Sequence, residues 1–186
     1  MEINELLEDV RRGNVDSFEP VIRMYEKNIY RFCFFMLGNR QEAEDAAQDV
    51  FFKAYRHLGG YDERQTFKAW LYKIAENHCR NVLKRRWKWL RLLPLFRSDG
   101  RTESAEQAYS EQMGTEMAFW FKDLSLPEKK LLFLRVVEEC SFDEIAQMMG
   151  ESAPTLRKRF ERLKRKLRAK KMQEEEMCDE RRLELR

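Results

Sequence analysis

The chain has 186 residues, of which 43% are hydrophobic and 37% charged, and its net charge is +3. This length suits one domain or two small ones, and the apolar content excludes a disordered chain. Seven glycines and four prolines are too few for an all-β or loop-rich fold, whereas strong helix formers dominate the composition. We therefore expect an all-α protein with two small helical domains joined by a flexible linker.

The start of the chain and its cysteines argue against a secreted or membrane protein. The acidic N-terminal segment lacks a basic stretch followed by an apolar one, and the longest apolar run covers only residues 32–37. The four cysteines are scattered without a CxxC pair, which is typical of free thiols in a reducing compartment. We expect a cytoplasmic protein with no stable membrane insertion and no bound metal.

The N-terminal part of the chain predicts three helices. Helical periodicity from residue 3 to 38 breaks at Gly13-Asn14, and a third helix follows at about residues 41–58. One half of that third helix is apolar, and the opposite half carries Asp45, Gln48, Asp49, Phe52 and Arg56. Phe52 therefore lies in the middle of an acidic, polar face. The pattern leaves open whether Phe52 is an isolated exposed aromatic or the hot spot of a protein-docking surface.

A fourth helix is predicted from Phe67 to about Trp87, after the turn residues 59–62. Its apolar face includes His78, which we interpret as a core residue rather than a catalytic one. The other face carries Lys73, Asn77, Arg80, Asn81, Lys84 and Trp87. Basic, amide and aromatic side chains along one helical face are typical of phosphate contact combined with base contact or stacking.

A linker is predicted at residues 89–114, because Pro94, Asp99-Gly100 and a stretch rich in Ser, Thr and Glu interrupt the helical pattern. Its first part, WKWLRLLPLF, is unusually apolar for a linker. That segment is compatible with a membrane surface, with a groove of a partner, or with a continuation of the preceding helix packed on its own domain. The pattern favours the continuation.

The second predicted domain, residues 115–171, contains a helix-turn-helix. One helix begins at Ser125-Leu126-Pro127-Glu128 and runs through Val137. Ser141 then caps a short helix that Gly150 ends, and Ser152 caps the next, which is the spacing of a helix-turn-helix. The last helix buries a stripe of Leu156, Phe160, Leu163 and Leu167. It leaves outward Thr155, Arg157, Lys158, Glu161 and Arg162, at the end where a recognition helix meets base edges.

Two basic stretches stand out in an otherwise acidic chain. Residues 84–101 have a net charge of +6 and residues 154–171 of +9, so the remainder sums to −12. This distribution suggests a protein that contacts a polyanion at two separate places, with Lys166 as a predicted phosphate contact. Solvated helix faces are the alternative interpretation.

Three segments carry motifs that resemble those of one bacterial family, and they occur in the same order as in that family. EAEDAAQDVFFKAY (residues 42–55) is similar to a core-polymerase-binding helix, and FKAWLYKIAENHCRN (residues 67–81) to a −10 promoter helix. Residues 126–168 are similar to a −35-binding domain. Together they resemble the extracytoplasmic-function group of the sigma-70 family of sigma factors, over nearly the whole chain apart from the linker and the last fifteen or so residues.

The resemblance implies a function for each part of the chain. Residues 1–88 would bind core RNA polymerase and recognise and melt the −10 element, residues 115–171 would recognise the −35 element, and residues 172–186 would form a charged tail. The β′ clamp helices would contact Asp45, Gln48, Asp49 and Phe52, and the β subunit is a further expected contact. The −10 DNA would contact Tyr61, Lys73, Asn77, Arg80 and Lys84, with Tyr61 as the candidate for a flipped base. The −35 DNA would contact Thr155, Arg157, Lys158, Glu161 and Arg162, and an anti-sigma factor is an implied partner.

Departures from the family pattern leave the promoter sequence open. They are Asn81, Glu151, Pro154 and Glu161. The tail is either a helical partner site or a frayed charged segment. The main alternative function is a stand-alone helix-turn-helix regulator with an N-terminal interaction domain. An enzyme is disfavoured because no phosphate loop, HExxH motif or nucleophile elbow occurs, so no catalytic residue, cofactor or small-molecule substrate is expected.

Overall fold

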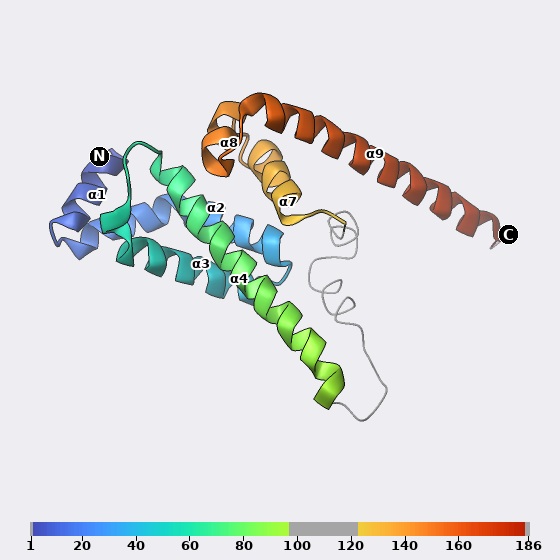
Figure 1. The fold of residues 1–186 in the computed structure, drawn as a ribbon, viewed down its shortest axis with the longest axis horizontal. Coiled ribbons are helices and arrows are strands. Elements are labelled where there is room, and N and C mark those ends of the chain that lie inside the picture. The colour runs from blue at the N-terminus through green and yellow to red at the C-terminus, as the bar shows by residue number, and fades with distance from the viewer. Residues whose placement is uncertain (1, 97–122, 185–186) are drawn as a thin grey trace. The chain divides into compact units, whose positions relative to one another are not determined.

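The computed structural model describes the backbone of residues 2–96 and 123–184 and the side chains of residues 2–88 and 123–172. Every regular element in these residues is helical (Figure 1), which confirms the all-α prediction. The chain divides into two compact units, with the boundary between Ala118 and Phe119. The predicted linker overlaps the end of one described helix, and its residues 97–114 lie outside the described residues.

Among its described residues, the first unit contains four α-helices and two short 3-10 turns. They are α1 (Ile3–Arg11), η1 (Val15–Ser17), α2 (Phe18–Leu37), α3 (Arg40–Arg56), η2 (Leu58–Gly60) and α4 (Phe67–Phe96). The predicted break at Gly13-Asn14 is confirmed. Gly38 ends α2 with a left-handed φ of 68°, and the Asn39 side chain accepts the Glu42 backbone N–H at 2.8 Å to begin α3.

The core of the first unit lies between α2, α3 and α4. Val21, Ile29, Val50 and Leu71 are fully buried there, and each such side chain stabilises the fold by about 1.5–3 kcal/mol. The rings of Phe32 and Tyr72 meet edge to face at 5.2 Å between centroids. This packing fixes the outer faces of α3 and α4, which carry most of the predicted binding residues of this unit.

Arg86 is a basic residue of the 84–101 stretch that holds the fold together. Both its terminal nitrogens donate to the Leu37 carbonyl at 3.3 Å, and it forms an ion pair with Glu42. The guanidinium thereby caps the C-terminal end of α2 and links it to Glu42 in the first turn of α3. Arg86, one of the basic residues predicted to contact a polyanion, therefore stabilises the fold instead.

Helix α4 is longer than predicted. It continues through Phe96, past the expected end near Trp87 and past Pro94. The favoured interpretation of WKWLRLLPLF as a continuation of the helix is thus confirmed for the backbone. Whether this segment packs on its own domain lies outside the described side chains.

The second unit contains α7 (Leu126–Leu132), the π-helical turn η3 (Phe133–Val137), α8 (Phe142–Met149) and α9 (Ala153–Glu184). Capping boxes begin α7 at Ser125 and α8 at Ser141, and Gly150 ends α8 with φ 68°. The two predicted helix starts and the predicted stop are therefore confirmed. Helix α9 continues as one element into the residues predicted to be a tail. The helix-turn-helix is therefore confirmed.

The apolar pattern of α8 predicts an inward face of Phe142, Ile145, Ala146 and Met149, and the structure differs from it. Ile145 and Met148 are buried, whereas Phe142, Ala146 and Met149 are only half-buried. Lys130 is also buried in this unit, with a 2% exposed side chain that donates from Nζ to the Met148 carbonyl at 2.8 Å. The ammonium group of this buried lysine also interacts favourably with the negative C-terminal end of the α8 dipole.

Glu139 connects η3 to α8 in a left-handed conformation, with φ 53°. That conformation costs a non-glycine residue about 1 kcal/mol. We therefore expect Glu139→Gly to raise the free energy of unfolding by about 1 kcal/mol in urea titrations followed by circular dichroism. Glu138→Gly is the matched control and should destabilise, because Glu138 has φ −94°. A loss of stability at position 139 would contradict the argument from strain.

Candidate protein-binding and nucleic-acid interfaces

The outer face of α3 carries the four residues predicted to bind polymerase. Asp45, Gln48, Asp49 and Phe52 are all exposed, and the Phe52 ring is 60% exposed. The guanidinium of Arg56 lies 5.6 Å from the Phe52 ring centroid. The structure thus leaves a large aromatic side chain in water, surrounded by acidic and amide groups.

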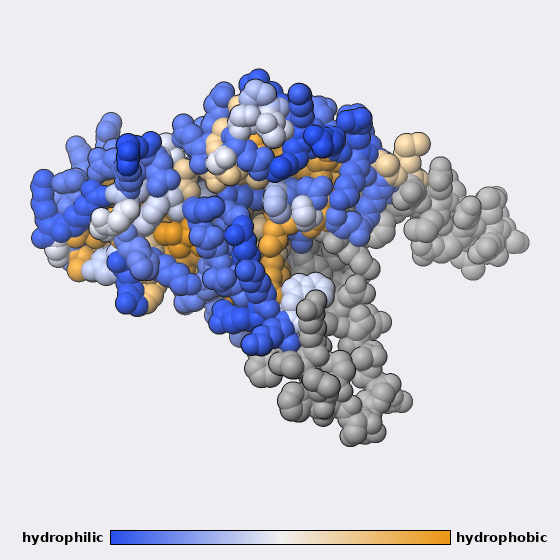
Figure 2. Space-filling view, in the orientation of Figure 1, coloured by the Kyte–Doolittle hydropathy of each residue, from blue (hydrophilic) through white to orange (hydrophobic). Residues whose placement is uncertain are grey.

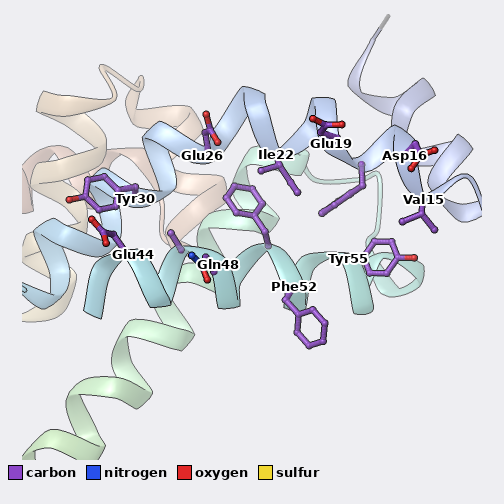
Figure 3. Close-up of a pocket in the computed structure, with 13 residues that line it drawn as sticks. Val15, Asp16, Glu19, Ile22, Glu26, Tyr30, Glu44, Gln48, Phe52 and Tyr55 are labelled. Atoms are coloured by element: carbon purple, nitrogen blue, oxygen red, sulfur yellow. The ribbon is translucent and has the colours of Figure 1, made fainter. Parts of the chain in front are cut away.

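An open groove runs beside this face, between α2 and α3 (Figure 3). Its floor is apolar, with Phe18, Ile22 and Phe51, and acidic side chains line its rim. These acidic residues are Asp16, Glu19, Glu26 and Glu44. Gln48, Phe52 and Tyr55 also line the groove, although Figure 3 shows Phe52 pointing away from α2. The groove and the exposed face of α3 are therefore adjoining parts of one surface.

His78 lies beneath the α3 face and is buried, which confirms that it is a core residue. Its Nδ1 contacts Lys53 Nζ, and its Nε2 lies 3.7 Å from Asp49 Oδ2. Burial lowers the pKa of His78, and the charges of Lys53 and Arg85 lower it further, while Asp49 raises it. A neutral imidazole therefore lies between a cation and a carboxylate of the predicted polymerase-binding face.

The lowered pKa of His78 makes stability depend on pH. Because the unfolded chain takes up the proton first, the free energy of unfolding should fall as the pH drops below about 6.5 and level off below the folded pKa. We expect His78→Gln to remove this dependence between pH 8 and 5.5, measured as the midpoint of thermal unfolding. His57→Gln, at an exposed position, is the control. If His57→Gln flattened the profile instead, the assignment to His78 would be wrong.

The outer face of α4 is basic. Lys73, Asn77 and Lys84 are exposed, Arg80 is partly exposed, and Trp87 is 64% exposed. Hydrophilic colouring follows this helix in the space-filling view (Figure 2). The buried carboxylate of Glu76 pairs with Arg80 at 2.5 Å and lies 3.9 Å from Lys73 Nζ. Glu76, which the sequence did not single out, therefore positions two of the predicted DNA-contacting cations.

Tyr61 does not have the exposure expected of a stacking residue. It is only 6% exposed, its ring packs against Phe67 and Trp70, and its hydroxyl donates to the Gln65 carbonyl at 2.8 Å. Burial is also the main cause that raises its pKa. In this structure the ring is therefore packed inside the unit, and contact of Tyr61 with a flipped base stays a prediction. The turn residues that follow, from Glu63 to Thr66, are exposed instead.

The N-terminal half of α9 presents the five predicted −35 residues to solvent. These are Thr155, Arg157, Lys158, Glu161 and Arg162. The Arg157 guanidinium lies 5.6 Å from the centroid of the Phe142 ring, which also contacts Arg135 at 5.1 Å. Glu161 pairs with Lys164 at 2.7 Å. The inner side carries the predicted stripe, with Leu156 and Leu163 buried and Phe160 and Leu167 half-buried.

Two charged residues near this surface are engaged within the unit. Glu151, which departs from the family pattern, accepts a hydrogen bond from Arg159 at 2.6 Å. Lys166 Nζ donates to the Asp123 carbonyl at 2.7 Å and lies 3.5 Å from Glu128. The prediction of Lys166 as a phosphate contact therefore loses its support, because its ammonium group bridges α9 to the start of α7.

The cysteines with described side chains are free thiols. Cys33, Cys79 and Cys140 are all buried. A hydrogen bond to Cys79 and burial both raise the pKa of Cys33, which makes its thiolate unfavourable. Among the described residues, none of the helices combines the length and apolar character needed to cross a bilayer.

Comparison with known proteins connects these surfaces to a family. Residues 21–88 match Sigma-70 region 2, and residues 122–167 match Sigma-70, region 4. The chain is 28% identical over 182 residues to the ECF RNA polymerase sigma factor SigW of Bacillus subtilis, which covers 90% of this chain and 96% of the relative. The two family matches together span more than half of the chain.

Solved structures share the fold. CnrH in complex with the cytosolic domain of CnrY has a TM-score of 0.67 at 21% identity, covering 89% of this chain and 94% of that one. The sigma factor RpoE in complex with the anti-sigma factor NepR from Bartonella quintana has a TM-score of 0.62 at 16% identity, covering 82% and 95%. From the two family matches and the relative, the chain belongs to the extracytoplasmic-function group of the sigma-70 family of RNA polymerase sigma factors.

Proposed function

We propose that this sigma factor binds core RNA polymerase through α3 and promoter DNA through α4 and α9, with no catalysis of its own. One observation carries the proposal: a single helical unit presents an acidic face with an exposed Phe52 on α3 and a basic face on α4. The two faces have opposite chemical character, which suits a protein partner on one and a polyanion on the other. Such partners place the protein in the cytoplasm.

The polymerase contact is assigned to Asp45, Gln48, Asp49 and Phe52. An exposed aromatic anchor surrounded by polar groups is typical of a binding hot spot. The adjoining groove has an apolar floor and an acidic rim, so it suits a partner helix with apolar and basic side chains. The β′ clamp helices are the partner that we assign to this surface, and the β subunit is a further contact.

The −10 contact is assigned to Lys73, Asn77, Arg80 and Lys84, together with the exposed residues of the turn after Tyr61. Melting the −10 element requires a base to leave the stack, which costs a few kcal/mol. Cations on α4 hold the backbone of the strand, and amide groups contact the bases. Trp87 offers an exposed ring for stacking further along the same helix.

The −35 contact is assigned to Thr155, Arg157, Lys158, Glu161 and Arg162. Arginine pairs bidentately with guanine and glutamate accepts from the N4 amino group of cytosine, so this helix face has the groups needed to read sequence in the major groove. We also assign an anti-sigma factor as a partner. The support is that a solved protein of the same fold is bound to an anti-sigma factor.

The test adds the purified protein to sigma-free core RNA polymerase with fragmented genomic DNA, and sequences the run-off transcripts. Initiation at sites that share a two-part promoter is the expected result, and it also supplies the recognition sequences. Core polymerase without the added chain is the control. Absence of initiation, combined with specific binding of DNA by the isolated protein, would favour a stand-alone helix-turn-helix regulator instead.

A further inference from the structure

Arg11, the last residue of α1, reaches the turn between α3 and α4. Its Nη2 donates to the Tyr61 carbonyl at 2.9 Å, and its Nη1 donates to Glu63 Oε1 at 2.9 Å. Its guanidinium carbon also lies 5.8 Å from the centroid of the Tyr61 ring. One side chain therefore contacts the backbone, a carboxylate and an aromatic ring of the same turn, about 50 residues away in the sequence.

The turn itself, residues 61–66, is also built by local contacts. The Tyr61 hydroxyl closes the turn on the Gln65 carbonyl, and Asp62 accepts the Arg64 backbone N–H at 3.0 Å. The Tyr61 ring is packed on Phe67, the first residue of α4. The turn is thus held to α4 by its ring and to α1 by Arg11, while residues 63–66 stay exposed.

An arginine suits this position better than another cation. A planar guanidinium donates in two directions at once and packs on an aromatic ring, whereas a lysine ammonium is a single point charge. Arg12, the next residue, has a 74% exposed side chain and pairs only within α1, with Glu8 and Asp9, among the contacts described. The interaction with the turn is therefore specific to position 11. Arg11 also lies outside the residues that match Sigma-70 region 2.

We propose that Arg11 is a positioning residue for promoter opening: it fixes the turn 61–66 in the shape that receives an extruded base of the −10 element. The inference rests on the proposed −10 function of this unit. A turn that is already ordered in the free protein does not lose conformational entropy when the base is captured. The entropic cost of ordering the turn then opposes folding and not DNA binding. Burial of Tyr61 supports this role, because the ring then shapes the turn from within.

The test measures binding of a single-stranded non-template −10 oligonucleotide to holoenzyme reconstituted from core polymerase and the full chain. The oligonucleotide sequence is taken from a promoter found by run-off sequencing. Arg11→Ala should weaken this binding about tenfold, the effect of losing one charge-assisted hydrogen bond. Arg11→Lys should bind the oligonucleotide as weakly as Arg11→Ala does. Arg12→Ala, the matched control, should bind like the wild type. Permanganate reactivity of −10 thymines on duplex promoter should fall in parallel with oligonucleotide binding.

A merely structural role would give a different pattern. Affinity for core polymerase should stay within twofold of wild type in Arg11→Ala, because the α3 face is not part of the turn; a parallel loss of core affinity would overturn the proposal. Equal binding by Arg11→Ala and Arg12→Ala would also overturn it. Asn77→Ala tests the proposed −10 face separately. If Asn77→Ala has no effect while Arg11→Ala weakens binding, the assignment of the α4 face fails and the role of Arg11 stands.

Discussion

The double variant Asp49→Arg, Phe52→Ala is expected to lose binding to core RNA polymerase, with an affinity at least a hundredfold below that of the wild type. Truncating an interface hot spot costs about 2 kcal/mol or more, and a reversed charge against a complementary surface adds to that cost. Both side chains are exposed, and because Phe52 is 60% exposed its truncation removes little buried apolar area. The loss should therefore reflect the interface and not unfolding.

The measurement is a pull-down of core polymerase followed by titration, with the midpoint of thermal unfolding recorded for each variant. Met24→Ala is the matched control, because Met24 is a 50% exposed apolar side chain on α2. It should bind like the wild type. Asp49→Asn should give an intermediate loss, since it removes the charge without reversing it. Unchanged binding by the double variant, with an unchanged midpoint, would remove α3 as the polymerase-binding face.

The faces of α3 and α9 could be predicted from the sequence because apolar periodicity determines them. A helix buries its apolar stripe whatever it packs against, so Val50 and Leu163 had to face inward and Phe52 and Arg157 outward. Caps were equally predictable, because a capping box is formed by residues three apart. The structure has such boxes at Ser125 and Ser141, where the sequence predicts the starts of two helices.

Contacts between distant elements could not be predicted in this way. Arg11, Arg86 and Lys166 all look like exposed cations in the sequence, yet each bridges two elements through a long side chain. Each of them has a backbone carbonyl among its partners, and a carbonyl carries no sequence signal. Tyr61 shows the same limit, since turn residues give no periodicity from which its burial follows. These residues became identifiable only when the helices were placed in space.

The length of α4 was underestimated for a different reason. Proline normally ends a helix, and Pro94 therefore marked a linker in the sequence. The residues before it are strong helix formers, and the helix continues through Phe96. Two residues of the basic stretch therefore have different roles. Lys84 lies on the exposed face of α4, while Arg86 caps the C-terminal end of α2 and pairs with Glu42 of α3.

In the second unit, Arg157→Ala is expected to relax specificity at one position of the −35 element. A bidentate contact to guanine contributes about 1–3 kcal/mol of discrimination, which corresponds to a factor of about 5 to 150. Phe142 supports this expectation, because the Arg157 guanidinium lies over its ring and so has fewer conformations to lose on binding. Arg165→Ala, at another exposed arginine of α9, is the matched comparison.

Arg165 is expected to contact phosphate, so its loss should weaken all −35 variants equally and reduce the salt dependence of binding by about one unit of slope. Holoenzyme is titrated against every single-base variant of the −35 element at two salt concentrations. For Arg157→Ala, the preference for one base pair should disappear while the other positions keep theirs. Equal losses at all positions for both variants would mean that Arg157 also contacts only the DNA backbone. Base recognition would then be assigned to Lys158, Glu161 and Arg162.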